Sequence, residues 1–305
     1  MNWRLKAVIQ KSISFLPGKT TINRHLQQIT GGLALDDLQF QWKIEHARDH
    51  YTYYEQLGQV PLAEAKVLEL GTGWYPIVPV YFYLQGCHSF DSIDIYQWLK
   101  AENYTATIAK FKAWRETGML DAYVTSIDEG RWAVLMDILE GQLSVDEINQ
   151  RINFRPVLGD AASSTALASS YDLICSNNVL EHIYPVHLEP ILARFHQMVA
   201  KGGIMSHFID LSDHFAHSDE SISIYNFLRF SQRQWQWIDN DIQPQNRLRW
   251  SEYIDMFRRL GIPNTIEDVR SGLSEVFTRS EVHDMYRDFT DEDLMISHGQ
   301  IVSQY

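Results

Sequence analysis

The stretch from Lys66 to Pro76 constrains the fold of this chain more than any other, because it joins a buried strand to a helix through a glycine turn. Most side chains of the strand are apolar, and Glu69 stands just before the turn. Gly71 and Gly73 permit backbone conformations and close approaches that a Cβ atom would prevent. Pro76 suits the first turn of a helix, where its missing N–H is not needed. A helix N-terminus behind such a turn predicts a seat for a polar or charged ligand.

The glycine turn alone does not decide which ligand it binds. A dinucleotide fingerprint has the pattern G-x-G-x-x-G, whose third glycine packs the helix against the strand. Pro76 occupies that third position here, which disfavours the binding of a pyrophosphate. An ordinary strand–turn–helix connection without a ligand is the other interpretation. The spacing of the segments that follow has to distinguish between them.

The two segments after the turn complete a βαβ unit. Residues 77–84 are apolar nearly all round, which predicts a helix buried against a sheet. Residues 89–95 indicate a second strand, with Asp94 near its end. An acidic residue about 20 residues after a glycine turn accepts hydrogen bonds from ribose hydroxyls in nucleotide-binding folds. Asp94 therefore indicates a nucleoside ligand.

Two further predicted strands also end in polar residues. A short strand from Phe154 closes in a Gly-Asp-Ala sequence around Asp160, although this aspartate could also cap a helix. Residues 171–183 read Tyr-Asp-Leu-Ile-Cys-Ser-Asn-Asn-Val-Leu-Glu-His-Ile, and the chain leaves the strand at Asn177 and Asn178. Ligands of open α/β sheets bind at the carboxyl ends of strands. The four predicted strand ends therefore point to one ligand site.

Together these motifs resemble those of the class I S-adenosylmethionine-dependent methyltransferases. Residues 69–73, Glu-Leu-Gly-Thr-Gly, resemble motif I of that family, and residues 172–183 resemble the signature after its fourth strand. The resemblance is strong over residues 65–210 and weak at both ends. It implies an α/β fold with a seven-stranded, mostly parallel Rossmann-like sheet and helices on both faces. It also implies that S-adenosylmethionine is bound by Glu69, Gly71, Thr72, Gly73, Asp94, Ile95, Asp160, Ala161, Asn177 and Asn178.

In the family, the glycine turn wraps the amino-acid end of the cofactor. The acid after the second strand binds the ribose, and an acid in the place of Asp160 commonly binds the adenine amino group. The backbone N–H that follows it, here of Ala161, binds the ring. These roles are expectations that the resemblance carries to this chain.

The remaining segments are interpreted as additions to this core. N-terminal helices and helical insertions are expected to form a cap over the open end of the sheet, and residues 264–270 and 294–303 are expected to supply its last strands. The predicted parts are an N-terminal helical segment (1–64), the cofactor-binding core (65–212) with a helical insertion (96–152), an aromatic substrate cap (213–249) and the rest of the core (250–305). A lysine-Gly-Gly turn at 201–203 is expected to lead into the fifth strand.

Composition limits the possible partners. The net charge of −13 argues against nucleic acid as the main partner, because phosphate binding needs clustered positive charge. Nine Trp, fifteen Tyr and fourteen Phe residues suggest an aromatic pocket or lid for a small molecule. The first 35 residues carry five basic side chains and no acidic one. A basic amphipathic helix formed by this segment could lie on a membrane surface. We favour a helix that packs on the protein's own core or on a second copy in a homodimer. The five basic residues are Arg4, Lys6, Lys11, Lys19 and Arg24.

The cysteines and the hydropathy indicate the compartment. Cys87 and Cys175 form no disulfide framework or metal-binding pattern, and Cys175 lies within an apolar run. This usage is typical of a reducing cytoplasm. The sequence shows no apolar run of transmembrane length and no secretory signal pattern. We therefore expect a cytoplasmic protein.

Four residues near the cleft mouth are candidates for acid–base catalysis. Removing a proton from a hydroxyl or amine nucleophile calls for a general base, and histidine suits this role near neutral pH. His182 follows the fourth predicted strand, and His214 follows the fifth. We expect one of them to act as the base, oriented by Asp210 or Asp213. Each histidine could instead have only a structural role.

A divalent metal is the alternative interpretation of the same region. Ubiquinone-pathway O-methyltransferases and small-RNA 2′-O-methyltransferases carry Glu-x-x-Glu-His here as metal ligands, and this chain resembles them in Glu181 and His182. Asn178 replaces their first glutamate, which weakens the resemblance. Glu181 and His182 could still be joined by His207, or by Asp210 or His214, in a mixed oxygen and nitrogen site.

The leading functional prediction is methylation of an oxygen or nitrogen atom of a small molecule, such as a metabolite, a sugar or a natural-product intermediate. Two other classes remain open. One is a cofactor-binding or scaffolding protein without catalysis, which would tolerate loss of His182 and His214. The other is an NAD-dependent oxidoreductase on a related sheet. Pro76 and the sequence of residues 178–182 argue against this class.

Overall fold

The computed structural model describes residues 1–18, 22 and 35–305 of the chain. Lys19 and Arg24 of the basic N-terminal segment lie outside the described residues. The chain divides into two compact units. Unit 1 is formed by Met1–Ala34, Asn178–Glu189 and Phe208–Ile301, and unit 2 by Leu35–Asn177, Pro190–His207 and Val302–Tyr305.

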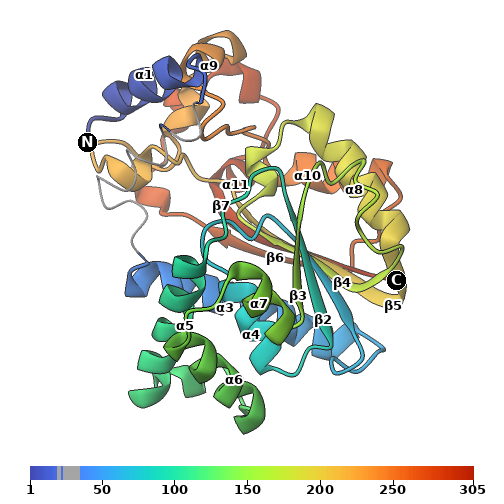
Figure 1. Cartoon of the computed structure of the whole chain (residues 1–305). Coiled ribbons are helices and arrows are strands. Elements are labelled where there is room, and N and C mark those ends of the chain that lie inside the picture. The colour runs from blue at the N-terminus through green and yellow to red at the C-terminus, as the bar shows by residue number, and fades with distance from the viewer. Residues whose placement is uncertain (19–21, 23–34) are drawn as a thin grey trace. The chain divides into compact units, whose positions relative to one another are not determined.

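A seven-stranded, mostly parallel sheet contains all four of the strands whose ends carry the sequence motifs, and it confirms the predicted α/β fold class (Figure 1). The hydrogen-bonded order is β3-β2-β1-β4-β5-β7-β6. Strand β1 pairs in parallel with both β2 and β4, and β2 pairs in parallel with β3. The strands are β1 (Lys66–Leu70), β2 (Ser89–Asp94), β3 (Phe154–Leu158), β4 (Tyr171–Asn177), β5 (Val199–Asp210), β6 (Ile266–Ser271) and β7 (Ile296–Gln304).

The helices of unit 2 follow from apolar periodicity along the chain. All eight residues of α4 are buried, as expected for a helix with apolar residues nearly all round. Helix α3 packs on α4 and β4, while α7 packs on β3. Figure 1 shows α5, α6 and α7 grouped near α3 and α4. The helices are α3 (Asp37–Leu57), α4 (Ile77–Leu84), α5 (Ala101–Glu116), α6 (Glu129–Glu140) and α7 (Val145–Arg151), with a 3-10 turn η1 (Met119–Ala122). Helix α8 (Pro185–Met198) begins in unit 1 and continues in unit 2 from Pro190.

The prediction of a turn at residues 201–203 is wrong, because these residues lie within β5. Gly202 has a φ of 80°, and the strand continues through it. Its N–H donates to the carbonyl of Tyr305, and the N–H of Tyr305 donates to the carbonyl of Gly203. A Cβ on Gly202 would lie 2.7 Å from Gln59 Oε1, so the glycine is also needed for this close approach. Pairing with the chain end, which is distant in sequence, extends the strand.

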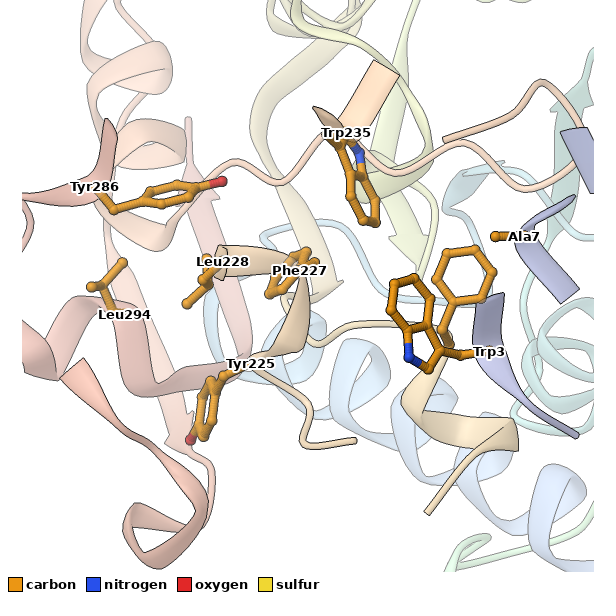
Figure 2. Close-up of a cluster of buried hydrophobic side chains, with 9 residues drawn as sticks. Trp3, Ala7, Tyr225, Phe227, Leu228, Trp235, Tyr286 and Leu294 are labelled. Atoms are coloured by element: carbon orange, nitrogen blue, oxygen red, sulfur yellow. The ribbon is translucent and has the colours of Figure 1, made fainter. Parts of the chain in front are cut away.

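Unit 1 has an aromatic core of its own, shown in Figure 2. Trp3 packs against Phe215 and Phe230 with ring centroids 5.9 and 5.7 Å apart, respectively. Trp235 packs edge-on against Phe227. The elements of unit 1 that have not been named above are α1 (Trp3–Ser14), η2 (Leu180–His182), η3 (Ala216–Ser218), η4 (Asn226–Arg229), α9 (Gln232–Ile238), α10 (Trp250–Arg259), η5 (Ser274–Val276), η6 (Arg279–Glu281), η7 (Asp284–Tyr286) and α11 (Asp291–Met295).

The N-terminal helix α1 belongs to this core. Its buried residues are Trp3, Ala7, Gln10 and Ile13, at the spacing of one helix face. Lys11 donates to the backbone carbonyls of residues 236 and 239, at the end of α9. Packing on the protein's own core was therefore the better interpretation of the basic start. Within the part of the chain that the structure describes, no helix is both long and apolar enough to cross a membrane.

Two histidines are enclosed in the interior of unit 2. His50 on α3 exchanges hydrogen bonds with Ser206 Oγ at 2.8 Å and Asn177 Oδ1 at 2.9 Å. His207 bonds Ser176 Oγ at 2.8 Å. Burial lowers the pKa of His50 to about 4 and that of His207 to about 3. Both imidazoles are therefore neutral in the folded protein at neutral pH.

We expect the contribution of His50 and His207 to the free energy of unfolding to fall as the pH is lowered from 7 to 4. The unfolded chain takes up protons near pH 6.5, whereas the folded histidines resist protonation down to their lowered pKa values. The stabilisation is complete above pH 6.5 and is lost through the window below it. The shift of His50 alone corresponds to a loss on the order of 3 kcal/mol. Denaturant unfolding at several pH values measures it.

A matched pair of variants separates the interior histidine from surface titration. His50→Gln should show a shallower loss of stability with falling pH than the wild type. His88→Gln removes an exposed histidine and should retain the wild-type dependence. Equal pH dependence in all three proteins would contradict the assignment.

Candidate functional site

The glycine turn after β1 has the backbone geometry that its sequence demands. Gly71 and Gly73 have φ values of 75° and 73°, in the left-handed region that favours glycine. Among the described residues, a Cβ on Gly73 would meet only one atom within 4 Å, Lys43 Nζ at 3.6 Å. Within that part of the chain, this ammonium group is therefore the nearest neighbour of the α-carbon on its side-chain side.

A carboxyl group and an ammonium group flank this turn within unit 2. Glu69 is 1% exposed, and Oε2 accepts a 2.7 Å hydrogen bond from Thr72 Oγ1. Burial raises the pKa of Glu69 to about 7, against the opposing influences of Lys43 and Thr72. Lys43 on α3 donates to the carbonyl of Thr72 at 3.2 Å, and desolvation lowers its pKa while Glu69 and Asp94 act in the opposite direction. The turn therefore presents both signs of charge.

Asp94 lies at the end of β2, as the sequence predicts. Its Oδ1 accepts from the N–H of Tyr96 at 3.0 Å. Burial raises the pKa of Asp94, while backbone N–H groups, including that of Gly73, lower it. The next side chain, Ile95, is 64% exposed, so an apolar surface adjoins the carboxylate. This pairing suits a sugar with a flat ring beside it.

Aromatic side chains of the glycine turn and of the segment that follows Asp94 pack on one another. Trp74 packs on Trp98 with ring centroids 4.2 Å apart, and Tyr96 packs on Trp98 at 5.1 Å. Trp74 thus has a partner in the segment that follows β2. Its bulk, unusual after a glycine turn, fills space next to that segment.

Asp160 follows β3 in an exposed turn. Its Oδ1 accepts from the N–H of Ala162 at 2.9 Å, and Oδ2 accepts from Ser163 Oγ at 3.0 Å. The aspartate therefore closes its own turn, as a capping residue does. Each carboxylate oxygen keeps a second lone pair for another donor. Ala161, beside it, is 3% exposed.

Asn177 and Asn178 end β4 in different ways. Asn177 is buried, and its side-chain oxygen contacts His50 within unit 2. Asn178 belongs to unit 1 and has a φ of 51°, a left-handed conformation that asparagine tolerates better than most residues. Its N–H donates to the carbonyl of Phe208 at 3.0 Å. This backbone bend redirects the chain from the strand into η2.

Lys43 and His50 are polar residues of this region that the sequence analysis missed. A signal for both exists in the spacing of α3. Residues 40, 43, 47, 50 and 54 follow one another at intervals of three and four, and the other three are Phe, Ala and Tyr. A lysine and a histidine on an otherwise apolar helix face indicate buried polar partners.

In unit 1, Asp210 at the end of β5 lies within reach of three histidines. His214 Nε2 lies 3.4 Å from Asp210 Oδ2, His298 Nε2 lies 3.6 Å from Oδ1, and His217 Nε2 lies 3.8 Å from Oδ2. Burial by itself raises the pKa of Asp210. The neighbouring His214, His298 and Ser212 side chains outweigh this effect and hold the pKa below its ordinary value. The carboxylate is therefore ionised and can stabilise a protonated imidazole.

His182 lies against His214, with ring centroids 4.8 Å apart. Its Nδ1 lies 2.7 Å from the carbonyl of Pro244, which assigns the proton to Nδ1 and leaves a lone pair on Nε2. Desolvation, together with the neighbouring His214, lowers the pKa of His182 to about 4. His182 is therefore a neutral imidazole at neutral pH.

The other predicted acid, Asp213, has different partners. Its Oδ2 accepts from Asn226 Nδ2 at 2.9 Å, and its Oδ1 accepts from the N–H of Phe215 at 2.8 Å. Burial raises the pKa of Asp213. Of the two aspartates, Asp210 is the one that faces the histidine rings.

Glu181 lies beside this group with a fully enclosed carboxyl. Neither oxygen has a hydrogen-bond partner among the described residues, and burial, with the nearby Asp210, raises its pKa well above its ordinary value. One ligand atom from each of Glu181, His182 and His214 lies within 4.8 Å of the others, a spacing that suits a metal ion. His207, the predicted third ligand, instead bonds Ser176 within unit 2.

Several solved structures are similar to this chain at low sequence identity. A TehB-like SAM-dependent methyltransferase from Corynebacterium glutamicum is 14% identical, with 87% of this chain and 98% of that chain covered and a TM-score of 0.38. The YcgJ protein from Bacillus subtilis is 14% identical over 85% and 97%, with a TM-score of 0.41. A protein of Galdieria sulphuraria, provisionally assigned as a sarcosine dimethylglycine methyltransferase, is 12% identical over 87% and 85%, with a TM-score of 0.46. No curated protein matches the chain.

The family assignment rests on the sequence itself. A family model described as a methyltransferase domain matches residues 44–282, which is more than half of the chain. This match confirms the resemblance to class I methyltransferases and the cofactor, S-adenosylmethionine, that the resemblance implies. The chain belongs to the methyltransferase domain family.

Proposed function

We propose that this protein transfers a methyl group from S-adenosylmethionine to an oxygen or nitrogen atom of a small molecule, with histidine as general base. The observation that carries the acid–base part is the approach of His214 Nε2 to Asp210 Oδ2 at 3.4 Å in a buried setting. The net charge of −13 supports a small molecule over nucleic acid. Family membership supports the transferase class.

The residues of the glycine turn fit the amino-acid end of this cofactor. That end carries an ammonium and a carboxylate group. The Glu69 carboxyl would hold the ammonium group, and the Lys43 ammonium would hold the carboxylate. The surroundings of Gly73 support the fit, because within the described residues a Cβ there would meet only Lys43 Nζ.

The rest of the cofactor would be held by the strand ends of unit 2. Asp94 would accept hydrogen bonds from the ribose, and the exposed Ile95 would cover the adenine ring. Asp160 and the N–H of Ala161 would bind the edge of that ring. When bound, the cofactor supplies a methyl group on a positively charged sulfur, which needs only an aligned nucleophile and a dry site.

The histidine group of unit 1 supplies the proton acceptor. Asp210, 3.4 Å from Nε2 of His214, would favour a proton on that nitrogen and stabilise the imidazolium that forms when His214 Nδ1 takes a proton. His182, whose pKa is lowered to about 4, is a weak base, and it would orient His214 by ring contact. His214 is therefore our choice for the base and His182 for a positioning role.

Removal of the Lys43 charge should weaken cofactor binding. Lys43→Gln deletes an ammonium group beside the glycine turn, and the loss of a hydrogen bond between charged groups corresponds to a reduction of about tenfold or more in affinity. Calorimetric titration with S-adenosylhomocysteine measures it. Lys66→Gln, at the exposed start of the same strand β1, is the control and should bind as the wild type does. Equal affinity of the two variants would contradict the role of Lys43.

His214→Gln should reduce methyl transfer about a hundredfold or more, which is the usual contribution of a general base. The assay follows a labelled methyl group from S-adenosylmethionine into a low-molecular-weight metabolite extract. Affinity for S-adenosylhomocysteine should stay unchanged, because the variant leaves unit 2 intact. His187→Gln, an exposed histidine of α8, should transfer as the wild type does. Full activity of His214→Gln would favour a scaffold or proximity mechanism without a base.

A metal ion is the second candidate for the same cluster, and the grouping of Glu181, His182 and His214 favours it. A bound divalent cation would ionise the Glu181 carboxyl, which has no other partner among the described residues. It would replace proton removal by a histidine with activation of the acceptor oxygen.

Chelation distinguishes the two accounts of this cluster. A histidine base predicts that EDTA treatment leaves transfer unchanged and that purified protein contains no stoichiometric metal. Elemental analysis and the labelled-methyl assay measure both properties. Activity that is lost with EDTA and restored by Mg²⁺, Mn²⁺ or Zn²⁺ would assign the cluster to a metal.

A further inference from the structure

Unit 1 has a partly open cavity of about 520 Å³, whose lining includes none of the proposed cofactor-binding residues and none of the clustered histidines. This volume is in the range of pockets that bind small molecules. Trp235, Tyr286, Met285 and Phe289 supply an apolar and aromatic part of its wall. Arg247 and Gln232 are among its polar residues. The wall thus combines flat rings with a cation.

The arginine of this wall is buried and has no ion-pair partner within the described residues. Arg247 is 4% exposed, and its guanidinium lies over the rings of Trp235 and Tyr286 at 4.9 and 5.8 Å. The two terminal nitrogens donate to backbone carbonyls of residues 227 and 230 and to Gln232 Oε1. Nε is buried without a hydrogen-bond partner. A buried cation without an anion is costly unless a ligand supplies one.

Two further polar groups near Arg247 are incompletely bonded. The hydroxyl of Tyr286 is buried and has no partner among the described residues. Arg249, fully buried behind the wall, also has one terminal nitrogen without a partner there. The positive charges of both arginines act on Tyr286, although burial, the larger influence, raises its pKa. Figure 2 shows the Tyr286 hydroxyl directed towards the side of the cluster on which Trp235 lies.

The backbone at Arg247 is also strained. Its φ of 60° lies in the left-handed region, which is unusual for a residue with a long side chain. Such strain persists where the surrounding structure enforces the conformation, and it is often found at binding sites. Here it sets the guanidinium between two aromatic rings.

The carboxylates of the wall are already engaged or lie in solvent. Asp239 accepts from the Tyr184 hydroxyl at 2.6 Å and from the N–H of Gln245. Glu252 accepts from the N–H of Arg249 at 2.8 Å. Asp241 is exposed. Asp239 and Asp213 act on Arg247 through space, and Asp293 and Glu252 act on Arg249, but none of the described acids forms an ion pair with either guanidinium.

The segment that carries Arg247 also contacts the histidine group. The carbonyl of Pro244 is bonded to His182 Nδ1, and the N–H of Asn246 donates to the carbonyl of Glu181 at 2.8 Å. One short stretch, residues 244–247, thus links the proposed base to the cavity. A substrate held at Arg247 would be placed beside the histidines of the same unit.

We propose that this cavity binds the carboxylate group of an aromatic small molecule, through the side chains of Arg247 and Tyr286, with the ring packed on Trp235. The proposal rests on the proposed methyltransferase function, because it names the chemical class of its acceptor. A guanidinium edge and a phenol together match the two oxygens of a carboxylate. The aromatic wall matches a flat body.

The test uses aromatic acids and their neutral amides. Phenylacetate, benzoate and indole-3-acetate are titrated into the full-length protein by calorimetry, each against the corresponding amide. At least one acid should bind about tenfold or more tightly than its amide, since a hydrogen bond to a charged group carries that difference. Equal affinities, or no binding by any of the three acids, would overturn the proposal. Tighter binding of phenyl phosphate than of every carboxylate would reassign the site to phosphate esters and overturn it as well.

Variants localise the binding. Arg247→Gln removes bonds that hold two carbonyls and could unfold the segment, so Tyr286→Phe is the main variant. It deletes only a hydroxyl without a partner, so the melting temperature should not fall, while affinity for the acid should drop about tenfold. Tyr225→Phe deletes a hydroxyl bonded to the carbonyl of Met295 in the same core and should leave affinity unchanged. Unchanged affinity in Tyr286→Phe would contradict the site.

A parallel titration with S-adenosylhomocysteine separates this proposal from the proposed function. Acid binding without binding of that nucleoside would support the cavity and count against methyl transfer. Binding of S-adenosylhomocysteine without binding of any acid would support the proposed methyl transfer and count against the cavity as a carboxylate site.

Discussion

The carboxyl group of Glu69, removed from water at the end of β1, is the constraint on which unit 2 depends. Burial of such a group is costly unless donors and a cation approach it, and here Thr72 and Lys43 do so. The requirement fixes the helix α3 against the glycine turn, because Lys43 reaches the carbonyl of Thr72 from that helix. The left-handed glycines let the turn come close enough. A charged site is the result.

Unit 1 depends on a second buried carboxylate, Asp210. Three histidines lie within 4 Å of it. Two of them, His214 and His298, help to hold its pKa low although burial alone would raise it. Arg247 and Arg249 of the same unit are also buried, and neither forms an ion pair within the described residues. Asp210 therefore supplies the acid–base pair with His214, and the arginines favour the binding of an anion. Both consequences follow from charges placed in a low dielectric.

Local signals explain why most of the sheet could be predicted from the sequence. The glycine turn at 71–73, the acid at 94 and the string at 171–183 each depend on neighbours in the chain, and the strands lie where these motifs place them. The features that were not predicted depend on hydrogen-bond partners that are distant in sequence. The course of β5 through Gly202 depends on pairing with Tyr305, and the roles of Lys43 and His50 depend on Thr72 and Ser206. Spacing alone could not decide that Asp210, not Asp213, faces the histidines.

The substrate class was the least predictable part, because it depends on which buried donors have no partner. A sequence shows that Arg247 and Tyr286 exist, but it does not show that their polar atoms are enclosed beside a cavity. The predicted cytoplasmic location and homodimer remain predictions, since they concern the protein's surroundings. The cap assigned to residues 213–249 remains a proposal in the same way.

Calorimetric titration of the purified protein with S-adenosylhomocysteine and, separately, with NADH tests the central claim most directly. The account predicts saturable binding of S-adenosylhomocysteine with about one equivalent per chain and no binding of NADH, because Pro76 replaces the glycine that a dinucleotide turn requires. No heat of binding with S-adenosylhomocysteine, or saturable binding of NADH in its place, would contradict it.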